Sequence, residues 1–353
     1  MHKPLALELR PKTFNGFIYN EHVVFVLQAM LEENMMPNGI MFSGIRGIGK
    51  TTLARLVAKT LNCQEYPAKE PCNKCESCLA ANEGLHPDIR EIDGATHGNI
   101  EDIRKIIDEI QLAPMVGSKK IFIIDEAHNL GRSTASWDAL LKVLEEPPPH
   151  ILWIFCTTQK HKIPETIKSR LISLDLKAVP TKIIADYLCF ISEDLEHNED
   201  SAMTIARAAD NSIRDALTIL EKISAYCADK GWDIATVSSA IGAFDTSIVV
   251  NILQSIIQKN AVGVWTELEQ QLDNGVDPGL LFDDGIVKPI NTLMSLILGS
   301  QVEQSDLYMP FVNQLGVPRL QYIANVIVNR SQSFIESTNK KLVLQILSME
   351  LCA

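Results

Sequence analysis

A glycine-rich stretch at residues 44–51 has the residue types and the spacing that bind a polyphosphate. It reads Gly-Ile-Arg-Gly-Ile-Gly-Lys-Thr, which fits the pattern G-x-x-x-x-G-K-[ST]. In this pattern the glycines let successive backbone N–H groups close around phosphate oxygens at the start of a helix. The lysine then reaches the β- and γ-phosphates, and the hydroxyl binds Mg²⁺. We therefore expect a nucleoside triphosphate to bind at Gly44, Ile45, Arg46, Gly47, Ile48, Gly49, Lys50, Thr51 and Thr52.

Two acids, Asp125 and Glu126, end an apolar run at residues 119–124. Such a run predicts a central parallel strand whose carboxyl end faces a ligand. A carboxylate at Asp125 suits Mg²⁺ together with Thr51, and a carboxylate at Glu126 suits activation of the attacking water. An Asp-Glu pair after a strand also occurs in solvated loops, but behind a phosphate-binding loop it predicts ATP hydrolysis.

Hydroxyl and guanidinium groups follow later in the chain. Thr157 and Thr158 come after a buried run at residues 151–156, where they either report on the γ-phosphate or cap a turn. Arg214 lies off the apolar stripe of a helical pattern at residues 213–223. Its side chain is either solvated or folds back over the nucleotide.

Four of the eight cysteines have the spacing of metal ligands. Four thiolates close a tetrahedral site with no vacant position, which is typical of a structural zinc site that takes no part in chemistry. One alternative is four free thiols. Another is an iron–sulfur cluster, because its cysteine ligands can also be separated by two residues. Disulfide bonds are not expected, because cysteine-rich disulfide frameworks are typical of small secreted chains. The candidate ligands are Cys63, Cys72, Cys75 and Cys78.

The elements that must position these residues alternate between strands and helices. Helical patterns separate five apolar runs, so we expect a parallel α/β sheet. After Pro180 the patterns are helical only. We expect three domains: an ATPase domain at residues 1–176 with a zinc module at 63–78, a helical domain at 177–241, and an all-helical domain of four or five helices at 242–353. The runs that predict strands lie at residues 39–42, 88–93, 119–124, 151–156 and 171–176.

The composition limits the class of protein. The chain has 353 residues, 46% of them hydrophobic, which is enough to build two or three cores. A net charge of −12 argues against a surface that wraps nucleic acid over its whole extent, although a local basic site stays possible. No window approaches the roughly 18 apolar residues of a membrane span. We expect a cytoplasmic protein.

Several motifs together resemble one family, the gamma/tau ATPase subunit of the bacterial DNA polymerase III clamp loader, within the AAA+ superfamily. The likeness covers nearly the whole chain. The glycine loop alone would indicate only a superfamily. The cysteine insertion directly after the loop's helix and the run Leu-Leu-Lys-Val-Leu-Glu-Glu-Pro narrow it to this family. The motifs lie at residues 9–14, 61–63, 63–78, 124–128, 139–147, 157–158, 169–170 and 212–217.

The resemblance implies roles for individual residues. Arg170 looks like an arginine finger given to a neighbouring subunit's ATP; Leu171 replaces the cysteine of the family's Ser-Arg-Cys motif, but the arginine carries the charge. The four cysteines match zinc ligands, and Arg10 is expected among the nucleotide-binding residues. The remaining roles are Walker A for Lys50 and Thr51, Walker B for Asp125 and Glu126, sensor 1 for Thr158 and sensor 2 for Arg214.

The resemblance also implies a fold and a function. It implies a RecA-like ATPase domain, a helical lid and a collar that assembles a ring-like pentamer with other clamp-loader subunits. With ATP, Mg²⁺ and Zn²⁺ as cofactors, such a subunit uses ATP binding to open a sliding clamp. Hydrolysis then closes the clamp on primer–template DNA, with no membrane involved.

The chain departs from the family pattern in a few places. His-Gly-Asn at residues 97–99 stands where the family tends to have basic residues, which predicts weaker DNA contact, and residues 131–136 are about two residues longer than the pattern. No extension follows the collar, so we expect no tau-type tail, as in a gamma-length form or in a separate lineage such as a phage's. Two alternatives stay open. One is another AAA+ motor, such as a branch-migration helicase, which would lack the four cysteines. The other is a non-hydrolysing scaffold resembling the delta-prime subunit, whose usual mark is a degenerate glycine loop.

Overall fold

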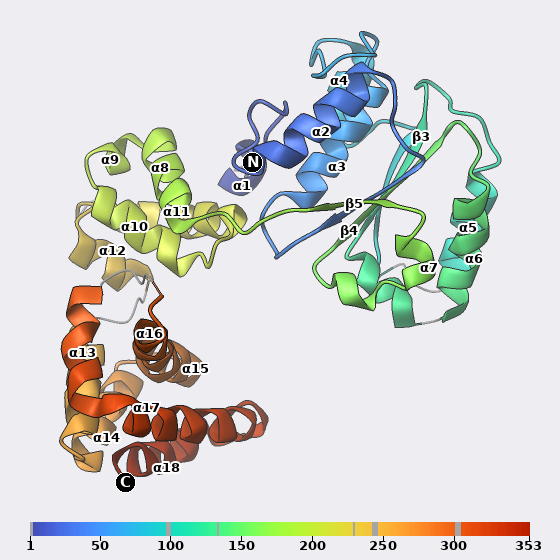
Figure 1. Ribbon diagram of the computed structural model, residues 1–353. Coiled ribbons are helices and arrows are strands. Elements are labelled where there is room, and N and C mark those ends of the chain that lie inside the picture. The colour runs from blue at the N-terminus through green and yellow to red at the C-terminus, as the bar shows by residue number, and fades with distance from the viewer. Residues whose placement is uncertain (1–2, 97–99, 133, 229, 242–245, 301–304) are drawn as a thin grey trace. The chain divides into compact units, whose positions relative to one another are not determined.

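The computed structural model describes residues 3–96, 100–132, 134–228, 230–241, 246–300 and 305–353 (Figure 1). The expectation of weak DNA contact at His97, Gly98 and Asn99 therefore lies outside the described residues, as does the predicted domain boundary at residue 242. The chain divides into two compact units, Met1–Val237 and Ser238–Ala353. Each unit is described by itself, and the finer division into ATPase, lid and collar domains stays a prediction.

Five parallel strands form the sheet of the first unit, in the order β2-β3-β4-β1-β5. This confirms the predicted α/β architecture. Parallel pairing brings the carboxyl ends of neighbouring strands to one edge, where Ser43 lies opposite Thr157 and Asp93 opposite Asp125. The strands are β1 (Gly39–Ser43), β2 (Ile89–Asp93), β3 (Lys120–Asp125), β4 (Ile151–Thr157) and β5 (Ile172–Asp175).

Helices cover both faces of the sheet (Figure 1), which explains why β1 and β4 are buried along their whole length. On one face the rings of Phe122 and Trp153 stack with centroids 4.9 Å apart, beneath helices α5, α6 and α7. The alternate residues of the same strands face α3. The helices of this part are α1 (Leu5–Glu8), α2 (Glu21–Glu32), α3 (Lys50–Leu61), α4 (Glu76–Glu83), α5 (Ile100–Glu109), α6 (Thr134–Glu145) and α7 (Glu165–Lys168), with short 3₁₀ turns at Ala127–Arg132 and Lys160–Lys162.

The regular elements that the structure describes after Pro180 are all helices, as predicted. Ser212 caps the N-terminus of helix α11, because its hydroxyl oxygen accepts the backbone N–H of Asp215 at 3.2 Å. Its apolar stripe, which includes Leu217 and Ile223, is buried, and Arg214 is exposed on its first turn. The helices of this segment are α8 (Thr181–Ile191), α9 (Glu193–Glu196), α10 (Glu199–Ala208), α11 (Ile213–Cys227) and α12 (Ile234–Ile241).

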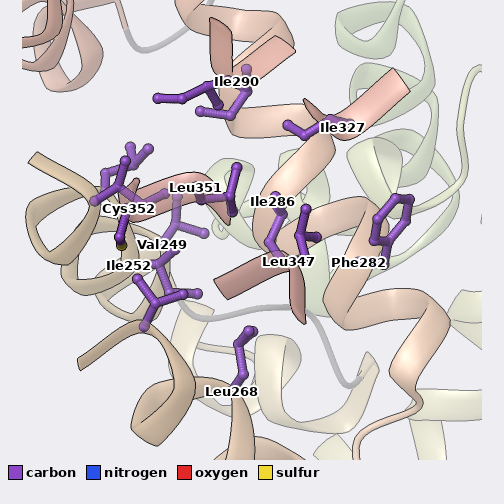
Figure 2. Close-up of a cluster of buried hydrophobic side chains, with 14 of the residues drawn as sticks. Val249, Ile252, Leu268, Phe282, Ile286, Ile290, Ile327, Leu347, Leu351 and Cys352 are labelled. Atoms are coloured by element: carbon purple, nitrogen blue, oxygen red, sulfur yellow. The ribbon is translucent and has the colours of Figure 1, made fainter. Parts of the chain in front are cut away.

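The second unit is all-helical. Among its described residues there are six α-helices, where four or five were predicted, because the apolar pattern at residues 280–298 is divided by a π-helical turn at Asp283–Val287. Gly316, with φ of 69°, kinks the longest helix. Figure 2 shows the buried side chains that form its core, among them Leu268, Phe282 and Leu347. The helices are α13 (Thr246–Ile257), α14 (Ala261–Asp273), α15 (Pro278–Phe282), α16 (Lys288–Ile297), α17 (Ser305–Glu336) and α18 (Lys340–Cys352).

Across the part of the chain that the structure describes, no helix has both the length and the apolar character needed to cross a membrane.

Candidate nucleotide and zinc sites

The glycine loop joins the carboxyl end of β1 to the first residue of α3. Gly47 and Gly49 of this loop leave no room for a side chain. A Cβ on Gly47 would stand 1.8 Å from the hydroxyl oxygen of Ser212, and a Cβ on Gly49 would stand 2.6 Å from the ring of Phe17. Both glycines also have positive φ, 77° and 101°, which glycine adopts without strain. The loop therefore passes close to both α11 and the N-terminal segment.

Lys50 is the first residue of α3, and its ammonium lies inside the loop. Nζ donates to the carbonyl oxygens of Gly44 at 2.9 Å and Ile45 at 2.7 Å. Burial lowers the pKa of Lys50, and the nearby carboxylates of Glu126 and Asp125 oppose this shift. The lysine is thus a buried cation, 5% exposed, surrounded by loop carbonyls and facing two acids.

Thr51, on the helix that follows β1, meets Asp125, the last residue of β3, although strand β4 lies between β1 and β3. The hydroxyl of Thr51 donates to Oδ2 of Asp125 at 2.8 Å. A hydroxyl and a carboxylate are hard oxygen ligands of the kind that Mg²⁺ prefers. The donor set therefore fits the predicted magnesium site.

Glu126 follows β3 in a left-handed conformation, with φ of 46°. Its Oε2 accepts the hydroxyl of Thr158 at 3.1 Å and lies 3.3 Å from Nδ1 of His128. The same ring nitrogen is 3.1 Å from the hydroxyl oxygen of Thr157. Burial lowers the pKa of His128 against the attraction of the Glu126 carboxylate. The hydroxyl of Thr158 holds the carboxylate of Glu126 by a hydrogen bond, and the ring of His128, to which sequence patterns had assigned no role, lies beside it.

A cavity of about 530 Å³ brings most of the predicted nucleotide-binding residues together. The charged side chains of Lys50, Asp125 and Glu126 line part of it. Arg214 lines it from α11, and the backbone N–H of Arg214 donates to the carbonyl oxygen of Gly47 at 3.4 Å. Apolar and aromatic side chains also line the cavity, as do the acids Glu91 and Asp93. A phenylalanine in a loop or a tyrosine on a helix is ordinary core material, so no motif marked Phe17 or Tyr187. The unpredicted lining residues include Phe17, Ile18 and Tyr187; the predicted ones also include Arg10, Arg46, Gly47, Ile48, Gly49, Thr51 and Thr52.

Arg170 lies away from this cavity, at the amino end of β5. Its carbonyl oxygen is 3.5 Å from the point where a Cβ on Gly39, the first residue of β1, would stand. Because the glycine loop follows the other end of β1, Arg170 and the cavity lie at opposite edges of the sheet. The guanidinium therefore does not reach the phosphate side of its own subunit's cavity.

The four predicted zinc ligands form a cluster. All four Sγ atoms lie within 4.8 Å of one another, and those of Cys72 and Cys78 are 3.9 Å apart. A tetrahedral zinc with Zn–S bonds of about 2.3 Å places its sulfur atoms about 3.8 Å apart, so the spacing fits zinc.

The surroundings of the cysteines shift their thiol pKa values in opposite directions. The backbone N–H groups of Lys74 and Cys75 donate to the sulfur of Cys72 at 3.4 Å and lower its pKa to about 6. Burial raises the pKa of Cys63 and of Cys78. A bound dication favours all four thiolates and would reverse the effect of burial.

Comparisons with known proteins agree with this geometry. A family model described as "DNA polymerase III, delta subunit" matches residues 19–180. The DNA polymerase III subunit tau/gamma of Haemophilus influenzae is 33% identical over 97% of this chain and 50% of its own length. The subunit tau of Bacillus subtilis is 37% identical over 81% of this chain and 50% of its own length. The chain spans about half the length of these relatives.

A similar solved structure is the Thermotoga maritima RuvB Holliday junction branch migration motor, which is 19% identical, with a TM-score of 0.48 over 87% of this chain and 91% of that one. The identity of 33% and 37% to the tau proteins extends over most of this chain. The chain belongs to the gamma/tau family of DNA polymerase III clamp-loader subunits.

Proposed function

We propose that this chain is an ATP-hydrolysing subunit of a DNA polymerase III clamp loader, which opens a sliding clamp and places it on primed DNA. The observation that carries the ATPase part is a set of contacts among polar side chains where β3 and β4 end, next to the cavity. Thr51 contacts Asp125, and Thr158 contacts the neighbouring Glu126. The buried ammonium of Lys50 faces both acids. These are the groups that phosphoryl transfer from ATP to water requires.

In this proposal each side chain has a separate role. Lys50 binds the phosphates, while Thr51 and Asp125 hold Mg²⁺, which neutralises charge on the transferred phosphoryl group. The carboxylate of Glu126 accepts a proton from the attacking water as the bond between the γ-phosphorus and the leaving oxygen of ADP breaks. Thr158 orients that carboxylate. Arg214 contributes positive charge from α11.

The wider assembly is part of the same proposal. Residues 177–241 act as a lid, and residues 242–353 act as a collar that joins other clamp-loader subunits into a ring-like pentamer around primer–template DNA. Arg170 completes the site of a neighbouring subunit, the four cysteines hold one structural zinc ion, and the protein works in the cytoplasm. The names of the relatives, which are twice as long, support the replication role.

Two measurements test the proposal, the binding of Mg-ATP by the chain and clamp loading by the reconstituted complex. Lys50→Ala should abolish binding of a fluorescent ATP analogue, because it removes the cation that contacts the phosphates. Lys142→Ala, at an exposed position of α6, should bind like wild type. In a complex reconstituted with its partner subunits and clamp, Lys50→Ala should also fail to load the clamp on primed DNA.

The family model named for the delta subunit keeps a second function in view, a scaffold subunit without hydrolysis. A scaffold would support clamp loading with wild-type and Lys50→Ala chains alike. Loading that survives Lys50→Ala would therefore replace the proposed ATPase role with the scaffold role.

A further inference from the structure

A carboxylate in the loop that carries the four cysteines holds the backbone of the N-terminal segment. Glu70 is half-buried, and its Oε2 accepts the N–H of Phe14 at 2.7 Å. Its Oε1 accepts the N–H of Asn15 at 2.8 Å and the side-chain amide of Gln28 at 3.0 Å. Both oxygens are thus bonded to donors from outside the cysteine loop, and they fix the chain at residues 14–15.

A second contact runs from the same loop to Lys12. The amide of Asn73, which lies between Cys72 and Cys75, donates to the carbonyl oxygen of Lys12 at 3.1 Å. The buried ammonium of Lys59 donates to that carbonyl at 2.7 Å and to Oδ1 of Asn73 at 2.7 Å. The backbone of Lys12 is therefore bonded to the cysteine loop directly and through one lysine.

The segment held in this way forms one side of the nucleotide cavity. Residues 10–18, called the wall segment below, contribute Arg10, Pro11, Phe17 and Ile18 to the lining. The ring of Phe17 packs on the glycine loop at Gly49. A turn joins Phe17 to the anchored residue, since its N–H donates to the carbonyl of Phe14 at 3.0 Å.

We propose that Glu70 and Asn73 are positioning residues for nucleotide binding, so that the fold of the cysteine loop and the affinity for nucleotide are coupled. This inference rests on the function proposed for the cavity. A wall segment that is already ordered loses less conformational entropy when a ligand packs on it, and the ligand binds more tightly as a result. The coupling is reciprocal, because a bound nucleotide then stabilises the anchored form of the cysteine loop to the same extent.

The zinc module then has a role in nucleotide binding, although a closed metal site takes no part in chemistry. A four-cysteine cluster with no open position cannot bind substrate. It can, however, hold Glu70 and Asn73 at fixed places, because both lie between the first and last of the four cysteines.

The test compares two neutralised acids of the same region. Glu70→Gln keeps the size of the side chain but presents an amide N–H₂ to one of its backbone donors. Glu83→Gln, at an exposed position near the end of α4, is the matched control. Without nucleotide, amide hydrogen exchange in the wall segment should be faster in Glu70→Gln than in wild type, and it should be unchanged in Glu83→Gln. Its Kd for a fluorescent Mg-ATP analogue should rise about tenfold, the effect of losing one hydrogen bond to a charged group. Its zinc content should stay at one ion.

A second variant keeps the test decisive when Glu70→Gln does not fold. Asn73 has φ of 55°, a conformation that glycine adopts freely, so Asn73→Gly removes the contact to Lys12 and keeps the backbone. It should show the same faster exchange and weaker binding. If the folded variants show unchanged exchange or an unchanged Kd while wild type binds nucleotide normally, the coupling is wrong and the proposed function stands. A wild-type chain that binds no Mg-nucleotide overturns the proposed function and the coupling together.

Discussion

The guanidinium of Arg170 pairs with the carboxylate of Glu145, with Nη2 and Oε1 2.6 Å apart. Nη1 of the same arginine donates to the carbonyl of Thr166 at 2.6 Å. The arginine that the family resemblance assigns to a neighbour's ATP is thus held by its own subunit. The pair is partly exposed, 33% for Arg170 and 46% for Glu145, and exposed ion pairs contribute little to stability. Arg170 can therefore leave Glu145 for a phosphate at small cost.

Arg170→Ala is the first prediction. The isolated variant should bind Mg-ATP like wild type, because Arg170 lies at the opposite edge of the sheet from the cavity. In the reconstituted complex, ATPase activity stimulated by clamp and DNA should fall by about 10³–10⁵-fold, as for other arginine fingers. Glu145→Gln is the matched variant, and it should keep full stimulation. An assembled Arg170→Ala complex that is stimulated like wild type would remove Arg170 from the mechanism.

Glu126→Gln separates binding from hydrolysis. The variant should keep its affinity for Mg-ATP, since Lys50, Thr51 and Asp125 are unchanged, while turnover of the complex falls about 10²–10⁴-fold through loss of the base. Single-turnover hydrolysis with radiolabelled ATP measures the chemical step directly. Thr158→Val is a milder companion that removes one hydrogen bond to Glu126, so its rate should fall less. Equal turnover by Glu126→Gln and wild type would exclude Glu126 as the base.

Metal removal tests the cysteine cluster. Elemental analysis of the purified chain should find one zinc ion and no iron, and a chelator should lower the melting temperature, because metal binding is linked to folding. Cys75→Ser should lose the metal, whereas Cys189→Ser, outside the cluster, should keep it. A chain that carries iron with visible absorbance would replace the zinc assignment with an iron–sulfur cluster.

Asp88 provides a prediction about pH. This fully buried carboxylate accepts the backbone N–H groups of Met115, Val116 and Gly117 at 2.7 to 2.8 Å. Burial acts to raise the pKa of Asp88, but these three donors outweigh it and leave the pKa below its ordinary value of 3.8. A lowered pKa in the folded state means that the ionised group stabilises the fold above the ordinary pKa. That stability is lost as the pH falls through the folded value.

Asp88→Asn should therefore lower the free energy of unfolding by about 1–3 kcal/mol at neutral pH, because the amide leaves buried donors unpaired. The difference from wild type should stay constant down to about pH 4 and narrow below it. Asp108→Asn, an exposed acid on α5, should change stability little at any pH. Urea unfolding at a series of pH values measures all three chains. A difference that grows on acidification would contradict the assignment.

The core of the second unit gives the last prediction. Phe282 and Phe334 stack with ring centroids 4.3 Å apart, and each is 4% exposed. Phe282→Ala should lower the free energy of unfolding of this unit by about 3–5 kcal/mol, since it removes a buried ring and leaves a cavity. Ile335→Ala, next to Phe334 but 78% exposed, is the control. Affinity for Mg-ATP should stay unchanged in both, and calorimetry with nucleotide titration separates the two effects.

Local patterns predicted the parts of the fold and site that local chemistry determines. The glycine loop, the acids at the end of β3 and the spacing of the cysteines were read directly, because each depends on a few neighbouring residues. The parallel order of the strands followed from their alternation with helices. The π turn inside residues 280–298 and the kink at Gly316 were missed. The π turn keeps nearly the same apolar spacing as a continuous helix.

Residues that act through distant contacts were not predictable in this way. Phe17 packs on Gly49, and Glu70 binds the backbone of Phe14, across gaps of tens of residues in the chain. Phe17 and Glu70 belong to no motif, and phenylalanine and glutamate occur throughout ordinary cores and surfaces. His128 was visible within the motif at residues 124–128, but only the structure shows its contact with Glu126.

The placement of the cavity and Arg170 at opposite edges of one sheet makes the protomer directional. If Arg170 completes the site of the next subunit, each contact joins two different surfaces, which makes the interface heterologous and excludes a two-fold symmetric pair that completes both sites. Subunits then stack in a single sense around an axis. In an open ring of such subunits the first cavity receives no arginine and the last arginine has no cavity, so the two ends differ chemically and a gap between them has a defined orientation.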